Sequence, residues 1–213
     1  MDSLILTTTN SRYIPIVSGL LRTFWEFHPE LKLCVLCVNL TEEEKEGLNK
    51  IHSNLMLVDD NHEFLNHDLE RNHCAHNRTW FMPVLMKQLQ CNILWLDADV
   101  ALKGKIDELF ERMKDVDFMI RAKTINPFTC NCGMVWTRFS SQNINILNEW
   151  GQETLKLHAN NDWYADQKSL NKVIQKYYNE LNLIKYESFP EKFNGKANNE
   201  KSLIIHYKGP KNI

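Results

Sequence analysis

The sequence predicts an α/β fold built around a mostly parallel sheet with helices on its faces. In the first hundred residues, short apolar stretches alternate with segments whose apolar residues recur at helical spacing. This alternation is typical of strand–helix–strand units, which build parallel sheets. The rest of the chain mixes strand-like and helical segments, and it contains no internal repeat or low-complexity linker. We therefore expect a single domain over residues 1–213, divided near residue 100 into a regular half and a mixed half.

Each element of the first half has a local signal. Ile16, Leu20 and Phe24 recur at helical spacing between Pro15 and Pro29, which favours a helix bounded by the two prolines. In chain order we expect a strand at 4–6, this helix, a strand at 32–38, a helix opened by a capping box at 41–44, a strand at 54–58, a helix at 78–90 and a strand at 93–96.

The second half has shorter and less regular signals. Leu170, Val173, Ile174 and Tyr177 share one face of a helix expected over 165–178. The other expected elements are a short helix from 107, strands at 117–120 and 132–136, a helix at 143–157, and strands at 183–186 and 203–206.

Composition excludes several classes of protein. The net charge is −2, whereas nucleic-acid-binding proteins usually have a basic face. No stretch approaches the roughly 18 apolar residues of a transmembrane span, so we expect no membrane-spanning segment. The first ten residues carry an acid and no basic residue, which argues against a signal peptide.

The six cysteines indicate a reducing compartment. Cys34 and Cys37 have the spacing of a zinc pair, but on a strand that spacing points them to opposite faces. Buried, reduced thiols are the favoured interpretation, and a soluble, cytoplasmic protein is the localisation that follows.

Residues 60–76 are polar and contain four histidines, His62, His67, His73 and His76. Their spacings match no compact metal-binding motif. The segment is predicted to be a solvated loop, with a metal site as the alternative.

The stretch Ile-Leu-Trp-Leu at 93–96 runs directly into Asp97 and Asp99. Ligands of parallel sheets bind beyond the carboxyl ends of the strands, and the polar groups at 7–10 and 59–60 also follow predicted strands. Two carboxylates spaced i, i+2 can share Mg²⁺ or Mn²⁺ once the chain turns. The alternative is a strand end capped by solvent.

Three further segments contain residues that could bind a metal, a phosphate or hydroxyl groups. His206 precedes Lys208, Gly209 and Lys211; an imidazole could bind a metal while glycine and lysines approach a phosphate, and a basic tail is the alternative. Asn131 and Gly133 precede a strand, where an amide could bind hydroxyl groups or form a turn. Asp166 and Gln167 lie near a helix start, where they could cap the helix or face a polyhydroxylated substrate. The residues that carry these hypotheses are Asn131, Gly133, Asp166, Gln167, His206, Lys208, Gly209 and Lys211.

The order of these motifs along the chain resembles that of the retaining glycosyltransferases of the GT-A fold, in the group of glycogenin and the bacterial galactosyltransferases. The motifs that carry the resemblance are Arg78, Leu96-Asp97-Ala-Asp99, Asp107-Glu-Leu-Phe110, Asn131-Cys-Gly133, Asp166-Gln167 with Leu170-Asn171, and His206-Tyr-Lys-Gly209. They span nearly the whole chain. The chain is as compact as glycosyltransferase domains of large algal viruses, which it also resembles, so the resemblance admits a viral protein acting in host cytoplasm.

The resemblance implies a role for each matching residue. Asp97, Asp99 and His206 would hold Mn²⁺ or Mg²⁺ against a nucleotide diphosphate. Thr7, Thr9, Asn10 and Tyr13 would line the nucleotide pocket, Arg78 would approach the sugar or diphosphate, and Gly133 and Gly209 would belong to the same site. Asn131 and Asp166 would bind sugar hydroxyls, Gln167 would lie opposite the leaving group, and Lys208 or Lys211 would stabilise it.

The implied activity is transfer of a hexosyl unit from a UDP-sugar to a hydroxyl group of a glycan or other acceptor, with retention at the anomeric carbon. UDP-glucose, UDP-galactose and UDP-rhamnose are the expected donors, bound by residues 1–100, with the acceptor and sugar bound by residues 101–213. The sequence departs from the family pattern at Lys211, which comes one residue early, and at Lys168, which replaces the usual acid.

Two other functions fit parts of the sequence. A phosphatase of the haloacid dehalogenase type also places Asp-x-Asp after an apolar strand, with the first Asp as nucleophile, but Ala101 stands where that family has Thr or Val. A non-catalytic module that binds a nucleotide sugar or a glycan would need the same pocket without turnover.

Overall fold

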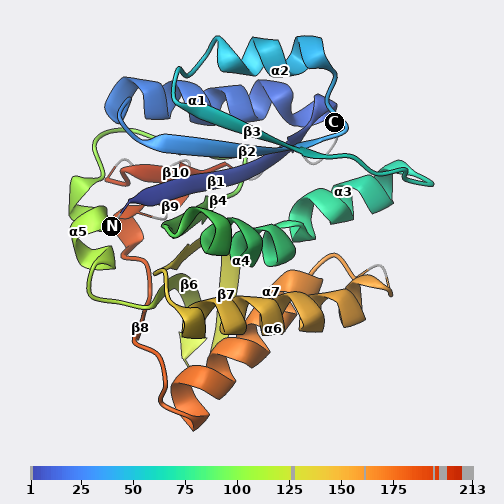
Figure 1. Cartoon of the computed structure of the whole chain (residues 1–213). Helices are drawn as coiled ribbons and strands as arrows, with labels where there is room; N and C mark the ends of the chain where they lie inside the picture. Colours follow the sequence, from blue (N-terminus) through green and yellow to red (C-terminus); the bar gives the residue numbers. More distant parts are fainter. Residues whose placement is uncertain (1, 126–127, 161, 194, 197–200, 208–213) are drawn as a thin grey trace.

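A seven-stranded sheet runs through the centre of the molecule (Figure 1). The computed structural model describes residues 2–125, 128–160, 162–193, 195–196 and 201–207. The strands lie in the order β3-β2-β1-β4-β7-β6-β8. Their bounds are Ser3–Asn10 for β1, Lys32–Val38 for β2, Leu55–Asp60 for β3, Asn92–Leu96 for β4, Phe118–Ile125 for β6, Phe128–Thr137 for β7 and Tyr186–Glu187 for β8.

The sheet is mostly parallel, as the alternating pattern predicts. The strands β3, β2, β1 and β4 pair in parallel, and so do β6 and β8. Only β7 runs against its neighbours, β4 and β6. A parallel arrangement brings the carboxyl ends of β1, β3 and β4 to one edge of the sheet.

A second, smaller sheet contains the strand that follows β4 and the last described strand. Its strands lie in the order β5-β10-β9, with bounds Val100–Leu102, Ile204–His206 and Gly195–Lys196. In the antiparallel β5–β10 pair, His206 lies opposite Val100. The last described strand therefore sits directly beside the turn that carries the Asp-x-Asp motif.

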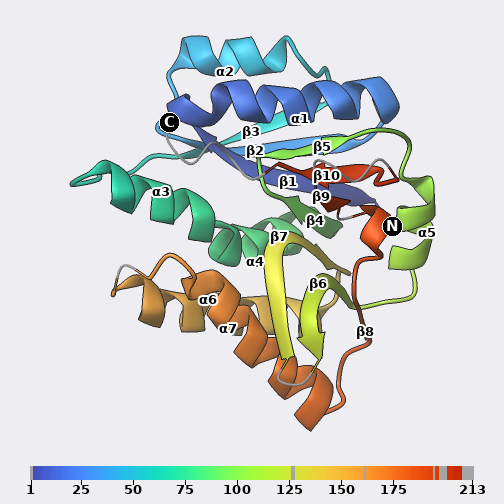
Figure 2. The same ribbon diagram turned by 180° about the vertical axis from the view of Figure 1, so that it is seen from behind.

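Helices cover both faces of the central sheet (Figures 1 and 2). On one face lie α1 and α2, and on the other lie α4, α6 and α7, with α3 leading into α4 and α5 at one end. The bounds are Ile14–Phe27 for α1, Glu42–Asn49 for α2, His67–His76 for α3, Arg78–Leu89 for α4, Asp107–Met113 for α5, Ser141–His158 for α6 and Ala165–Ile174 for α7. No helix within the described ranges has the length and apolar character to cross a bilayer.

Two apolar clusters, one on each face of the sheet, form the core. Along β1, Ile5 packs into the cluster under α1, while Leu4 and Leu6 pack into the cluster under α4 and α6. Cys37 and Cys34 likewise enter opposite clusters, which confirms the prediction that their spacing separates them. All six cysteines are free thiols, and all but Cys74 are buried.

The structure corrects the sequence prediction in several places. Residues 67–76 form α3 rather than a solvated loop, and Asn72, His73 and His76 on it are buried. The first strand extends through Thr7 to Asn10. The predicted strand at 183–186 is reduced to β8, the predicted helix at 165–178 continues beyond Ile174 as a π-helical turn over Gln175–Glu180, and β5 was not predicted.

Candidate functional site

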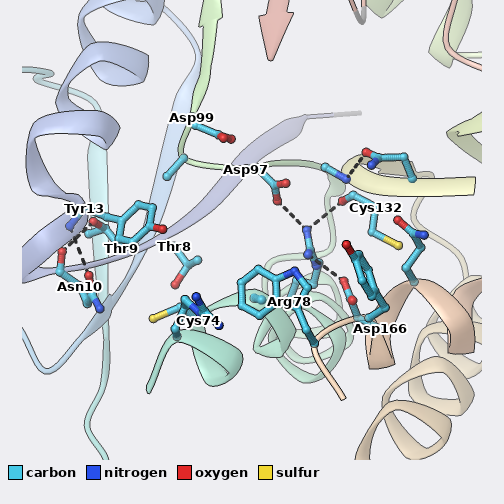
Figure 3. A pocket seen from close by; sticks show the side chains of 18 residues that line it. Thr8, Thr9, Asn10, Tyr13, Cys74, Arg78, Asp97, Asp99, Cys132 and Asp166 are labelled. Carbon is cyan, nitrogen blue, oxygen red and sulfur yellow. Dashed lines mark hydrogen bonds and ion pairs between the residues drawn. The ribbon is translucent and has the colours of Figure 1, made fainter. Parts of the chain in front are cut away.

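A cavity of about 230 Å³ opens at the carboxyl ends of β1 and β4 (Figure 3). Six segments contribute to its wall: the end of β1, helices α3 and α4, the turn after β4, strand β7 and the start of α7. The lining residues are Thr8, Thr9, Asn10, Tyr13, Arg71, Cys74, Ala75, Arg78, Asp97, Ala98, Asp99, Asn131, Cys132, Gly133, Trp163, Tyr164, Asp166 and Gln167.

Three potential metal ligands converge beside this cavity. One ligand atom from each of Asp97, Asp99 and His206 lies within 4.8 Å of the others, and we call this group the carboxylate cluster. The His206 Nε2 atom is 2.9 Å from Asp99 Oδ1 and 3.6 Å from Asp97 Oδ2. Residues more than a hundred positions apart thus meet because β10 pairs with β5.

Gly133 makes room for the carboxylate cluster. A Cβ atom at this position would lie 2.4 Å from His206 Cε1 and 2.9 Å from Asp97 Oδ2, which is closer than real atoms approach. The strand is irregular here, because the β6–β7 register shifts between Ile120 and Arg121. Bulges of this kind commonly re-aim groups next to active sites. A side chain at Gly133 would therefore displace the imidazole or the carboxylate.

Arg78 links the carboxylate cluster to the start of α7. Its guanidinium group lies 2.7 Å from Asp97 Oδ1 and 2.7 Å from Asp166 Oδ2, and it donates a hydrogen bond of 2.8 Å to the Cys132 carbonyl oxygen. Figure 3 marks these contacts of Arg78 with Asp97, Cys132 and Asp166 by dashed lines. The Trp95 indole adds a hydrogen bond of 3.1 Å to Asp97 Oδ1. One oxygen of Asp97 is thus held by protein donors, and the other faces His206.

The local charges shift the pKa values of the cluster. Burial alone would raise the pKa of Asp97, but the Arg78 guanidinium and the His206 imidazole outweigh it and lower that pKa. Burial alone would lower the pKa of His206, but its hydrogen bond to Asp99 and the two carboxylate charges raise it. Asp97 is therefore ionised at neutral pH, as a metal ligand must be.

Most of the sequence-predicted site residues line this one cavity. Those present in its wall are Thr9, Asn10, Tyr13, Arg78, Asp97, Asp99, Asn131, Gly133, Asp166 and Gln167. Thr7 is buried and does not line the cavity, whereas its neighbour Thr8 does. Lys208, Gly209 and Lys211 lie outside the described residues.

Sequence reasoning missed five polar or aromatic residues of the wall, which are Thr8, Arg71, Cys74, Trp163 and Tyr164. Arg71 and Cys74 lie on α3, which was predicted as a loop, so no helical face was available to place them. The Arg71 guanidinium lies 4.6 Å from the centre of the Trp163 ring, which joins α3 to the start of α7. The pair Trp163-Tyr164, separated from Asp166 only by Ala165, was the signal that could have found the aromatic part of the wall.

A search of solved structures finds glycosyltransferases. The bifunctional glycosyltransferase WbbM matches 98% of this chain with 46% of its own, at a TM-score of 0.68 and 13% identity. The galactosyltransferase LgtC, solved with donor and acceptor sugar analogs, matches 98% of this chain with 87% of its own, at 0.59 and 12%. The chain has the GT-A fold. Mouse xyloside xylosyltransferase 1 shares that fold over 98% of this chain and 97% of its own, at 0.58 and 16%.

This chain therefore spans about half of WbbM but most of the other two proteins. No protein-family model matches the sequence, and no curated protein does. At identities of 16% or lower, the similarity shows the GT-A fold alone. The chemistry has to be argued from the residues of the site.

Proposed function

We propose that this protein is a metal-dependent glycosyltransferase, which moves a hexosyl unit from a UDP-sugar to a hydroxyl group of an acceptor glycan with retention of configuration. The observation that carries the proposal is the convergence of Asp97, Asp99 and His206 beside a cavity in a GT-A fold. Residues 1–100 would form the nucleotide-binding half of the domain, and residues 101–213 would supply most of the groups that face the sugar and the acceptor.

The residues of the carboxylate cluster fit a hard divalent cation. Asp97 and Asp99 offer oxygen ligands and His206 an imidazole nitrogen, a set that suits Mn²⁺ or Mg²⁺ with positions left for phosphate oxygens. When bound, the ion would act as a Lewis acid on the diphosphate. The cavity wall carries Asp97, Asp99 and Asp166 against Arg71 and Arg78. A diphosphate entering among these carboxylates needs additional positive charge, which a divalent cation provides.

The nucleotide would lie along the end of β1. Thr9, Asn10 and Tyr13 line this part of the cavity, where Figure 3 shows the phenol ring of Tyr13 beside Thr9 and Asn10. The Asn10 Oδ1 atom accepts a hydrogen bond of 3.2 Å from the Tyr13 backbone N–H, which fixes the turn that presents the ring. A planar aromatic side chain at this position would stack on the uracil base.

The sugar would lie between the carboxylate cluster and the start of α7. Asn131, Asp166 and Gln167 line that part of the wall, and their amides and carboxylate suit sugar hydroxyl groups. Asp166 is 4% exposed and its carboxylate is ion-paired with Arg78 at 2.7 Å, so it is a poor candidate for a covalent nucleophile. A front-side path, in which the departing diphosphate takes the acceptor's proton, is therefore the proposed route to retention.

The test is UDP release from a panel of UDP-sugars, including UDP-glucose, UDP-galactose and UDP-rhamnose, with Mn²⁺, with Mg²⁺ and with EDTA. Wild-type protein should release UDP from at least one donor in the presence of metal, and Asp97→Ala and Asp99→Ala should abolish that release. Asp59→Ala is the matched control, because Asp59 is also a strand-end carboxylate but is exposed and paired with Lys45 at 2.5 Å.

Two results would contradict this function. UDP binding without UDP release across donors and acceptors would favour a non-catalytic binding module. Release of phosphate from small phosphoesters would favour a phosphatase. Against the phosphatase, the Asp97 Oδ1 atom is already engaged by Arg78 and Trp95, which weakens this carboxylate as a nucleophile.

A further inference from the structure

A second group of metal-ligand side chains lies outside the cavity, where β3 ends. One ligand atom from each of Asp60, His62 and His73 lies within 4.8 Å of the others, and we call this group the histidine cluster. We infer that the histidine cluster is a binding site for Zn²⁺ or a similar transition-metal ion, distinct from the carboxylate cluster. The inference does not depend on the proposed transferase activity.

Both imidazoles of the histidine cluster direct their Nε2 atoms at the Asp60 carboxylate. His62 Nε2 lies 2.7 Å from Asp60 Oδ1, and His73 Nε2 lies 2.8 Å from Asp60 Oδ2. Zinc ligands lie about 2.0–2.2 Å from the ion, so tetrahedral neighbours are separated by roughly 3.3 Å. Each of the two imidazole–carboxylate distances would lengthen by about half an ångström to reach that separation around one ion.

Burial and backbone hydrogen bonds hold the three side chains of the histidine cluster in place. Asp60 is 3% exposed and His73 is 8% exposed. The backbone of His62 is fixed by two hydrogen bonds with the Asn39 side chain, of 2.8 and 2.9 Å. Asn39 itself has a φ angle of 54°, a left-handed conformation that costs energy for a residue other than glycine. Such local strain often supports a functional arrangement of side chains.

The ligand chemistry selects the metal. Two imidazoles and one carboxylate favour Zn²⁺ and related transition metals, whereas Mg²⁺ prefers oxygen ligands throughout. The Asn77 Nδ2 atom donates a hydrogen bond of 3.0 Å to Asp60 Oδ2, which is the outer-shell support that metal-binding carboxylates usually receive. The His62 side chain is 49% exposed, so an ion has access and water can complete the coordination.

A bound ion would stiffen the wall of the cavity. Asp60 ends β3 and His73 lies on α3, so the ion would join the sheet to the helix that carries Arg71 and Cys74. The same Asn77 amide that contacts Asp60 also donates a hydrogen bond of 2.9 Å to Thr8 Oγ1 at the cavity. The consequence is mechanical coupling between the histidine cluster and the end of β1.

The experiment is zinc titration of the full chain by calorimetry, with Co²⁺ absorption to report the coordination. All proteins carry Asp99→Asn, which removes one ligand of the carboxylate cluster. His62→Ala is compared in this background with His67→Ala. His67 is the matched control because it lies in the same segment, is partly exposed and contacts Glu70 at 3.5 Å without belonging to the cluster.

The expected result is one tightly bound Zn²⁺ in the Asp99→Asn protein and in the His67→Ala control. His62→Ala should weaken that binding by about 100-fold or more, beyond what outer-shell substitutions cost. Zinc at a hundredfold excess over Kd should raise the unfolding midpoint by about 5 °C or more, and this rise should vanish in His62→Ala.

Two results would overturn the inference. One is zinc affinity that is equal in His62→Ala and His67→Ala, and the other is no zinc binding in the Asp99→Asn protein. Both variants are first compared in EDTA by circular dichroism, so that loss of binding is not loss of the fold. Because Asp99→Asn removes the metal-dependent activity proposed above, failure of that activity would leave this result unaffected.

Discussion

The carboxylate cluster and the histidine cluster use the same residue types in opposite proportions. Asp97 and Asp99, which line the cavity, share one imidazole, whereas Asp60, which does not line it, is shared by two imidazoles. The first set is assembled by the pairing of β5 with β10, from residues far apart in sequence. The second is assembled within 14 residues, between the end of β3 and helix α3.

The two proposed metal sites would therefore differ in their chemistry. Oxygen-rich sites hold Mg²⁺ or Mn²⁺ loosely enough to share the ion with phosphate, while nitrogen-rich sites bind Zn²⁺ more tightly. A shared ion belongs in a cavity that a substrate enters. A tightly held ion belongs where a helix must be fixed to the sheet.

The largest effect is expected for the carboxylate cluster. Asp99→Asn keeps the size of the side chain but removes one charged ligand, so metal-dependent UDP release should fall on the order of a thousandfold, equivalent to several kcal/mol of lost stabilisation. Initial rates at saturating Mn²⁺ measure this. His62→Ala is the comparison, and equal losses in the two variants would erase the distinction between the clusters.

A steric change should have the next largest effect. In Gly133→Ala the new Cβ would overlap His206 and Asp97, so Mn²⁺ affinity should fall about 10–100-fold. Manganese titration followed by electron paramagnetic resonance gives the affinity. Gly19→Ala is the control, because a Cβ at that position meets nothing within 4 Å. Unchanged affinity in Gly133→Ala would mean that the cluster relaxes without cost.

The two clusters should also differ in their contribution to the metal-free fold. Asp60→Asn removes charge-assisted hydrogen bonds to two imidazoles, so the free energy of unfolding should fall by about 1.5–3 kcal/mol. Asp99→Asn weakens one contact to an imidazole, that of His206, and also relieves repulsion between neighbouring carboxylates, so its effect should be smaller. Urea unfolding in EDTA measures both changes, and a larger loss for Asp99→Asn would contradict the comparison.

The smallest expected effect concerns two imidazoles outside both clusters. His76 and His158 share a contact of 2.8 Å between their Nδ1 atoms, and burial lowers the pKa of each below the ordinary value of 6.5. Below about pH 6.5 the unfolded chain takes up protons that these folded side chains resist. The free energy of unfolding should therefore fall as the pH drops from about 7 to about 5.5.

His158→Gln sharpens this prediction, since the amide can still contact His76 but does not titrate. Its free energy of unfolding should depend less on pH than that of wild-type protein over the same range, measured by urea unfolding. An identical or steeper dependence would mean that the pKa of His158 is not lowered in the folded state.

The regular half of the fold was predictable because its signals are local. Residues 32–38 were predicted as a strand and form β2, and the Thr41–Glu44 capping box opens α2 with both of its hydrogen bonds. Helix α3 was missed because its buried residues Asn72, His73 and His76 are polar, so no apolar periodicity marks it. The end of β1 was missed for the same reason.

The site was predictable in composition but not in geometry. Local sequence identified Asp97, Asp99 and His206 as candidate metal ligands, and the family resemblance placed all three against a nucleotide diphosphate. The spacing of His62 and His73 matches no compact motif, because a strand end and a helix bring these side chains together in space. Long-range pairing and buried polar contacts are properties of the folded chain that periodicity does not encode.

The central claim, that the carboxylate cluster presents a divalent cation to a nucleotide diphosphate, is tested most directly by UDP calorimetry with and without Mn²⁺. The account predicts that Mn²⁺ strengthens UDP binding by about 100-fold or more, equivalent to about 2.7 kcal/mol, and that Asp99→Asn removes this gain. Equal UDP affinity with Mn²⁺ and with EDTA, or a full Mn²⁺ effect in Asp99→Asn, would contradict it.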